Sequence, residues 1–394
     1  MVQQINETLT EKVVGWRRHL HRHPELSHRE FETANYIEGV LNGFGDGLEV
    51  SKPTATSVLA VLKGTKPAEG NAPVIAFRAD IDALPIEEEA DIDFRSENPG
   101  VMHACGHDCH PAMLLGAVSE LVGRRDEFAG EMRFIFQHAE EVSPGGAEQL
   151  VEKGVIDEVD QIFALHIQPD YPAGKFSVRE GSLTSAADDF IVRIIGSGGH
   201  ASTPQLCVDP LAIGSEIVMS AQQIVSRKLP PLKVPVLTIA TFHCGEANNV
   251  IASHAELTGT IRSHDPEVRV KARDLFEQVV RGITDAHGAG YELEWELGCP
   301  GVVNAAGPVD ISRQAARDIY GAENVFEVGE PAFGTEDFAF YSEAIPASMQ
   351  FIGVHNEDFG HAHPLHHGKM KVDESALPLG AAYYIRVAEN VFGM

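Results

Sequence analysis

A cysteine and a histidine separated by one glycine, Cys105-Gly106-His107, lie in the stretch of this sequence that is richest in metal-binding side chains. A thiolate and an imidazole are both ligands for late divalent metal ions, and glycine permits an unusual turn between them. Asp108 follows directly, and a carboxylate there can orient a ligand imidazole through a hydrogen bond. The triplet is equally compatible with a buried cysteine beside a polar histidine, so its spacing alone leaves both interpretations open.

Two adjacent glutamates, Glu140 and Glu141, follow an expected strand. Neighbouring strand residues point to opposite faces, so both carboxylates can serve one site only where the backbone is irregular. Ser143, Pro144 and Gly145 supply that irregularity just past the strand. One glutamate can then bind a metal ion while the other takes a proton from metal-bound water. The alternative is a pair of solvated surface acids.

Further acidic and histidine side chains stand near the ends of expected strands. Asp80 and Asp82 accompany one strand, and His166 ends another. In open α/β sheets ligands bind beyond the carboxyl ends of the strands, so these side chains would meet there. Near the C-terminus four histidines crowd into seven positions, and spacing does not choose among them: His361, His363, His366 and His367.

A glycine-rich segment at 196–199 leads into His200. It lacks the full pattern of a phosphate-binding loop, so we interpret His200 as a residue that reaches a substrate. Asn249 and Arg262 follow in the same region. An arginine matches a carboxylate with two parallel hydrogen bonds, although Arg262 could instead form a surface ion pair at a strand end.

The elements that must position these residues form an α/β pattern. Strand patterns at 72–80, 131–137 and 161–166 alternate with helical ones, which is typical of a mostly parallel sheet with helices on both faces. From 185 to 298 the order becomes β-α-β-β-α-β, a ferredoxin-like arrangement. We therefore expect a discontinuous catalytic domain, 1–184 and 299–394, interrupted by an inserted lid domain at 185–298.

Bulk properties exclude several classes of function. The 394 residues carry a formal net charge of −28, which disfavours nucleic-acid binding and docking on anionic membranes. Five cysteines, an odd number in a chain this long, do not make a disulfide framework. The sequence lacks an apolar run long enough for a membrane helix, and its N-terminus lacks the apolar core of a signal peptide, so we expect a cytosolic protein.

Taken together, the motifs resemble the M20 metallopeptidase superfamily. The closer resemblance is to its aminoacylase/amidohydrolase branch, which contains hippurate hydrolases, indoleacetyl-amino acid hydrolases and N-acetyl-diaminopimelate deacetylases. The similarity runs through nearly the whole chain, in this order: RRHLHRHPELSHREFET from Arg17, FRADIDALPI from Phe77, MHACGHDCH from Met102, FQHAEE from Phe136, GGHASTP from Gly198, NNVI from Asn248, GTIR from Gly259, GTEDFAFY from Gly334 and LHHGKMKVDE from Leu365.

The resemblance implies that five side chains bind two divalent metal ions per subunit: Cys105, His107, Glu141, His166 and His366. It also implies that Glu140 is the general base and that Asp82 supports the ligands from behind. In the inserted domain, His200 would stabilise the oxyanion, coming from the lid of a partner subunit in a homodimer. Asn249 and Arg262 would hold the substrate.

The implied reaction is hydrolysis of the amide bond of a small N-acyl or N-aroyl amino acid. A thiolate ligand favours zinc, while carboxylate and imidazole ligands also suit manganese or cobalt. A dipeptidase or carboxypeptidase with the same site is the nearest alternative. A catalytically silent metal-binding dimer is another, although such a protein has no need of a base at Glu140.

The chain departs from the family pattern at a few positions. Cys109 stands where a glycine is common, and Gln205 stands where a histidine is frequent. His367-Gly368 and Met370 replace the usual Ser-Pro and Phe. These changes leave every expected ligand in place, but they leave the shape of the substrate pocket open.

Overall fold

The computed structural model describes residues 7–68 and 70–394, which fold into two compact units. The first unit comprises Met1–Gly181, Val303–Glu330 and Asp337–Met394. The second comprises Ser182–Val302 and Pro331–Glu336. Most of the second unit thus falls between two parts of the first along the chain.

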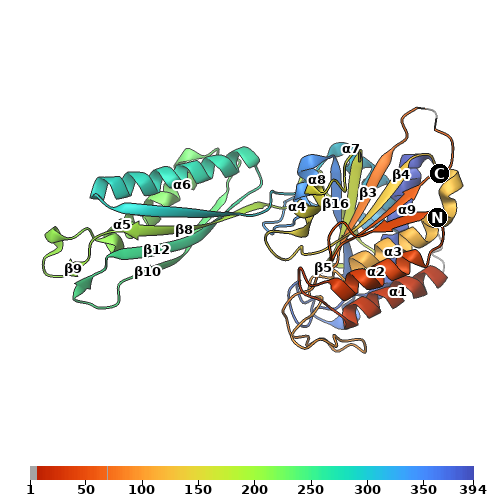
Figure 1. The fold of residues 1–394 in the computed structure, drawn as a ribbon, viewed down its shortest axis with the longest axis horizontal. Coiled ribbons are helices and arrows are strands. Elements are labelled where there is room, and N and C mark those ends of the chain that lie inside the picture. Colours follow the sequence, from red (N-terminus) through yellow and green to blue (C-terminus); the bar gives the residue numbers. More distant parts are fainter. Residues whose placement is uncertain (1–6, 69) are drawn as a thin grey trace. The chain divides into compact units, whose positions relative to one another are not determined.

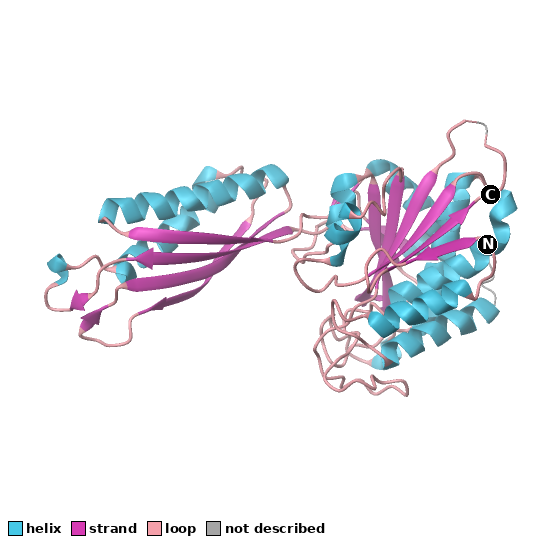
Figure 2. Ribbon diagram, in the orientation of Figure 1, coloured by secondary structure: helices cyan, strands magenta, loops and turns pink. Residues whose placement is uncertain are grey.

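The first unit is built on an eight-stranded sheet with the order β1-β2-β4-β3-β5-β16-β6-β15 (Figures 1 and 2). The four central strands, β4, β3, β5 and β16, run parallel to one another. The pairs β1–β2, β2–β4 and β16–β6 are antiparallel. The strands are β1 (Leu48–Ser51), β2 (Val58–Lys63), β3 (Val74–Asp80), β4 (Glu131–Gln137), β5 (Gln161–Pro172), β6 (Phe176–Val178), β15 (Val325–Glu327) and β16 (Ala347–His355).

Helices cover this sheet. Along the chain they are α1 (Glu7–Arg22), α2 (Phe31–Asn42), α3 (Cys109–Leu121), α4 (Gly146–Glu152), α7 (Ala306–Tyr320), α8 (Ala339–Ala344) and α9 (Leu377–Phe392). The buried ring of Phe77 on β3 packs edge-on against Tyr384 of α9 and stacks on Phe134 of β4. Burial of such large apolar rings is the main force that holds helices on a sheet.

The opposite face of the sheet is polar near its carboxyl end. Arg78 follows Phe77 on β3 and therefore points the other way. Its buried guanidinium donates to Asp337, just before α8, at 2.8 Å, and the Asp337 carboxylate accepts the backbone N–H of Ala147 in α4 at 3.0 Å. Elements therefore pack on both faces, and the mostly parallel α/β class that the sequence predicted is confirmed.

The second unit holds a four-stranded antiparallel sheet with the order β10-β12-β8-β13. Its strands and helices are β8 (Ala186–Ile195), α5 (Pro210–Gln223), β10 (Val236–Cys244), β12 (His254–Ser263), α6 (Pro266–His287) and β13 (Gly290–Leu297). Two short strands, β9 (Gly199–His200) and β11 (Val250–Ile251), form a separate ribbon. A core of its own, centred on Phe190 and Phe276, holds this unit together.

Local signals explain why α6 begins and ends where it does. The Asp265 carboxylate accepts the N–H groups of Glu267 and Val268, and Pro266 occupies the first turn. Gly288 ends the helix in a left-handed conformation with φ of 69°. In the part of the chain that the structure describes, none of the helices combines the length and apolar character needed to cross a membrane.

Candidate metal centre

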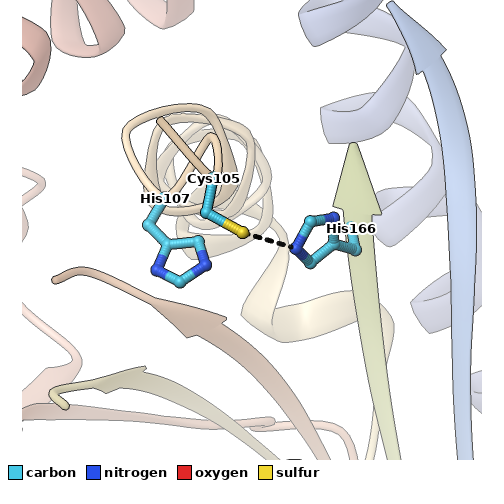
Figure 3. Close-up of side chains that lie close together, drawn as sticks. All are labelled: Cys105, His107 and His166. Atoms are coloured by element: carbon cyan, nitrogen blue, oxygen red, sulfur yellow. Dashed lines mark hydrogen bonds between the residues drawn. The ribbon is translucent and has the colours of Figure 1, made fainter. Parts of the chain in front are cut away.

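Cys105 and His107 lie in the turn that precedes α3, and His166 lies on β5 (Figure 3). Gly106 between the first two has φ of 87°, and a Cβ there would lie only 2.2 Å from Cδ1 of Ile167. Glycine is therefore required for both conformation and space. The turn brings Cys105 Sγ to 3.5 Å from His166 Nε2, and one ligand atom from each of the three side chains lies within 4.8 Å of the others.

The loop after β4 brings the two glutamates to the same place. One ligand atom from each of His107, Glu140 and Glu141 lies within 4.8 Å of the others. Ala139, directly before them, has φ of 50°. This left-handed residue breaks the strand alternation, so adjacent carboxylates can face one site, as expected from the sequence.

His366 supplies the fifth predicted ligand from the C-terminal part of the chain. Its ligand atom lies within 4.8 Å of those of Cys105 and Glu141. The backbone of His366 is left-handed, with φ of 64°, and its N–H donates to the carbonyl of Ala104 at 2.8 Å. Thus the structure brings together all five predicted ligands and Glu140.

Two atoms at the centre of this group test whether a cation fits. His107 Nε2 and Glu141 Oε1 are buried 3.8 Å apart, and among the described residues neither has a hydrogen-bond partner. Burial opposes a proton on His107, yet the charge of Asp80 raises its pKa well above the usual value. Buried polar atoms are normally satisfied, and the raised pKa of His107 shows that the pocket favours positive charge, so a divalent cation fits there in place of the proton.

A hydrogen bond fixes the tautomer of the His166 imidazole. His166 Nδ1 donates to the carbonyl of Ile167 at 2.6 Å, which leaves the Nε2 lone pair facing Cys105. Burial, followed by the nearby His110, lowers the pKa of His166 well below its usual value, so the ring is neutral. A neutral ring with a free nitrogen is the form that binds metal.

Asp82 holds two ligands at once. Its Oδ1 accepts from His107 Nδ1 at 3.1 Å, and its Oδ2 accepts the backbone N–H of Glu141 at 3.0 Å and the hydroxyl of Ser27 at 2.7 Å. Burial alone would raise the pKa of Asp82, but the bond to His107 lowers it. The carboxylate therefore keeps Nδ1 of His107 protonated and Nε2 available to a metal ion.

Asp108 does not orient a ligand imidazole, contrary to the sequence-based expectation. Its Oδ2 accepts from Arg17 Nε at 2.7 Å and from His21 Nδ1 at 2.8 Å, and all three side chains are buried. Because Asp108 directly precedes α3, its side chain turns away from the turn that carries His107 and fastens α1 to α3 instead. Spacing alone could not reveal this, since both partners lie more than 80 residues away.

Asp80, which the sequence places near the site, forms a buried pair with His110, a residue to which the sequence analysis gave no role. His110 Nε2 accepts the N–H of Ile167 at 3.0 Å, so its Nδ1 donates to Asp80 at 2.5 Å. Arg78 also donates to Asp80 at 2.6 Å. Both nitrogens of His110 are engaged, and Asp80 Oδ2 also lies 3.7 Å from His107 Nε2, so the pair stands beside the metal ligands. The sequence feature that could have pointed to His110 is its position three residues after His107, about one helical turn further along the chain.

The predicted site residues of the second unit lie in a more exposed setting. His200 on β9 pairs with Val250 on β11, and the carbonyl of Asn249 accepts the N–H of Ala201 at 3.1 Å. His200 is exposed, and its Nδ1 accepts the N–H of Ser202 at 3.0 Å. Arg262 on β12 donates to Thr260 at 3.1 Å and has no ion pair within the described residues. The β9–β11 ribbon thus brings His200 and Asn249 together, while Arg262 lies on the four-stranded sheet.

The model of peptidase family M20/M25/M40 matches residues 76–390. This chain belongs to that family. It is 46% identical over 303 residues to the N-acyl-L-amino acid amidohydrolase of Geobacillus stearothermophilus, covering 77% of this chain and 80% of the relative. It is 38% identical to thermostable carboxypeptidase 1 of Saccharolobus solfataricus, covering 95% and 94%.

A solved structure from Bacillus subtilis, described as a dinuclear metal-binding peptidase of the M20 family, has the same fold. It is 34% identical to this M20 chain, with a TM-score of 0.84, and the likeness covers 98% of this chain and 99% of that one. The family resemblance seen in the motifs is confirmed. The metal-binding description of the relative agrees with the donor set gathered here.

Proposed function

We propose that this chain is a metal-dependent amidohydrolase that cuts N-acyl or N-aroyl amino acids into a carboxylic acid and a free amino acid. The observation that carries the proposal is that two imidazole nitrogens converge on one buried carboxylate oxygen. His107 Nε2 and His366 Nε2 lie 3.8 and 3.3 Å from Glu141 Oε1, and within the described chain neither His107 Nε2 nor Glu141 Oε1 makes a hydrogen bond. The 46% identity to an N-acyl-L-amino acid amidohydrolase supports the substrate class.

Five side chains would hold the metal: Cys105, His107, Glu141, His166 and His366. When bound, two divalent ions supply a polarised amide carbonyl and a water of lowered pKa. The thiolate favours zinc, and the imidazole and carboxylate donors also suit manganese or cobalt. The buried Cys105 thiol has a pKa raised well above its usual value by burial, so binding a cation there must displace its proton.

Glu140 is the proposed general base. Its carboxylate lies beside the ligand atoms of His107 and Glu141, and its Oε1 accepts the N–H of Asp337 at 3.4 Å. From there it takes a proton from the attacking water and delivers it to the nitrogen of the leaving amine. One carboxylate therefore serves both halves of the reaction, and the chain needs no covalent nucleophile.

His200, Asn249 and Arg262 are the proposed substrate-binding residues of the second unit. Because His200 Nδ1 accepts the Ser202 N–H, the neutral ring carries its proton on Nε2. That N–H can donate to the carbonyl oxygen as it becomes negative. The guanidinium of Arg262 can pair with the carboxylate of the substrate, and Asn249 can hydrogen-bond to it.

The second unit is the proposed lid and dimerisation domain, inserted at about residues 185–298. Its order β8-α5-β10-β12-α6-β13 and its antiparallel sheet support a ferredoxin-like fold. Light scattering coupled to size exclusion tests the homodimer. A monomeric mass across the working concentration range contradicts it.

Peptide hydrolysis is the second candidate, because a carboxypeptidase is 38% identical over nearly the whole chain. The two activities need the same metal centre and differ in what flanks the scissile bond. A panel of N-acetyl, N-benzoyl and longer N-acyl amino acids, assayed beside dipeptides, separates them.

The decisive experiment runs this panel with metal-loaded wild type, Glu140→Gln and Glu148→Gln. Glu148 is an exposed glutamate in α4 and serves as the matched control. We expect amino acid release from the acyl substrates by wild type and the control, and a loss of about 10²–10⁴-fold in Glu140→Gln. Preferred cleavage of dipeptides moves the chain to the peptidase candidate. Inactivity of loaded wild type contradicts both.

A further inference from the structure

The segment between α1 and α2 takes no part in the proposed reaction, yet it packs against the loops that do. Leu26 forms a parallel bridge with Ala83, and the N–H of Ala83 donates to the carbonyl of Glu25 at 2.8 Å. The Ser27 hydroxyl donates to Asp82 at 2.7 Å. The motif that begins at Arg17 therefore places backbone and side chains directly behind the metal ligands.

Glu30 joins this segment to the loop of the base. Its side chain is fully buried, and its Oε1 accepts the backbone N–H of Ala139 at 2.8 Å and that of His28 at 3.0 Å. Ala139 has φ of 50° and His28 has φ of 63°. Residues other than glycine rarely adopt this conformation, and they keep it only where the surroundings hold them there. A single carboxylate oxygen thus fixes two left-handed residues, one of which directly precedes Glu140.

Other contacts anchor the far end of the same loop. His28 Nε2 donates to the carbonyl of Pro144 at 3.3 Å, and its ring packs edge-on against His138 with centroids 5.6 Å apart. Gly146 N–H donates to the carbonyl of Ala139 at 2.9 Å. The loop that carries Glu140 and Glu141 is therefore held at its start by Glu30 and near its end by His28.

We propose that Glu30 is a positioning residue for the general base, holding Ala139 left-handed so that Glu140 and Glu141 face the metal centre together. The inference rests on the proposed function in taking Glu140 as the base. Without the acceptor at Glu30, the Ala139 N–H is buried without a partner and the loop relaxes toward ordinary strand alternation. Glu140 then turns from the attacking water.

The role needs a hydrogen-bond acceptor rather than a charge. Burial raises the pKa of Glu30 to about 7, and its second carboxylate oxygen has no hydrogen-bond partner among the described residues. A glutamine keeps the acceptor oxygen in the same place, whereas alanine removes it. Rescue by glutamine therefore separates the positioning role from one that depends on charge.

The test compares wild type, Glu30→Ala and Glu30→Gln, with Glu32→Ala as a control at an exposed acid of α2. We expect Glu30→Ala to lower kcat about 100-fold with KM within about threefold, and Glu30→Gln to stay within about fivefold of wild type. Metal content by mass spectrometry stays unchanged in all variants. A loss of kcat below about threefold in Glu30→Ala, or an equal loss in Glu30→Gln, overturns the proposal.

Backbone amide exchange gives a readout that does not depend on turnover. Peptides covering 138–146 exchange faster in Glu30→Ala than in wild type and Glu30→Gln, because the loop has lost its anchor. Unchanged exchange contradicts the proposal. If wild type hydrolyses nothing in the panel while exchange responds as expected, the proposed activity has failed and the structural role of Glu30 has not. Glu30→Leu replaces the alanine variant if that one does not fold, since leucine fills the space without offering an acceptor.

Discussion

The metal centre of the first unit and the β9–β11 ribbon of the second carry the proposed site residues in opposite settings. His107 and His166 are buried, and supporting side chains or backbone carbonyls fix their rings. His200 is exposed, and the hydrogen bonds described for its ring are both with Ser202, two positions further along the chain. Substitutions at the metal centre should therefore also disturb the folding of the first unit. Substitutions in the ribbon should alter its chemistry with little effect on folding.

Metal removal should give the largest effect on activity, and it should act on the metal centre of the first unit without changing the ribbon. A chelator should reduce hydrolysis to background, and zinc or manganese should restore it, because the chain offers no nucleophile of its own in the proposed reaction. The metal-free protein should also melt at a lower temperature, since bound metal stabilises the folded state. Calorimetry with and without chelator checks this. Full activity in metal-free protein would show that hydrolysis does not depend on the metal centre.

Asp108→Asn should cause the largest loss of stability. Removing one partner of a buried ion pair costs about 3–5 kcal/mol. Although burial alone would raise the pKa of Asp108, the charges of Arg17 and His21 hold it well below the usual value. The stabilisation is therefore present above about pH 3.8 and is lost as the pH falls through the lower folded-state pKa.

Urea unfolding at several pH values measures the effect of Asp108→Asn. The gap between variant and wild type should be full at pH 7 and should close in acid. Glu127→Gln, which alters an exposed ion pair with Arg124, is the control and should leave the midpoint unchanged. A gap that widens in acid would show that the sign assigned to Asp108 is wrong.

His200→Ala should slow hydrolysis without affecting stability. Loss of one oxyanion donor typically lowers kcat about 10²–10³-fold. Because His200 is exposed and its ring is bonded only locally, melting temperature and metal content should match wild type. His287→Ala, another exposed histidine of the same unit, should behave as wild type. A lower melting temperature in His200→Ala would show that the ribbon, like the metal centre, contributes to folding stability.

Asp82→Asn should produce the smallest effect, a weakening of metal affinity by about 10–100-fold. An amide can present its NH₂ group to His107 Nδ1 and thereby favour the tautomer that cannot bind metal through Nε2. Competition with a fluorescent chelator measures the affinity. Unchanged affinity would mean that the His107–Asp82 bond does not control the ring.

Local patterns in the sequence predicted the elements that carry the site. In the sequence, a one-sided apolar stripe favours a helix over 266–287 and an apolar pattern favours a strand over 131–137, and α6 and β4 match both in their bounds. The sequence also favours a last helix over about 374–391, but α9 begins at Leu377, since Glu374–Ala376 form a 3₁₀ turn that Asp373 caps. Such boundaries depend on capping geometry that composition does not show.

The partners of the site residues could not be predicted in the same way. Asp108 was expected behind a ligand and instead binds Arg17, 91 positions away. Glu30 and Ala139 are 109 positions apart, and only folding shows that one holds the other. Ligand types follow from local motifs and the family resemblance, whereas the hydrogen bonds that orient them are long-range contacts.

The ligands at the two ends of the site also set when it can form during synthesis. Cys105 and Glu141 precede the second unit, whereas His366 follows it. A nascent chain on the ribosome therefore lacks the complete centre until both the second unit and the segment that carries His366 have been translated. Truncated chains that stop within or just after the second unit should therefore lack hydrolytic activity, even where the second unit itself folds.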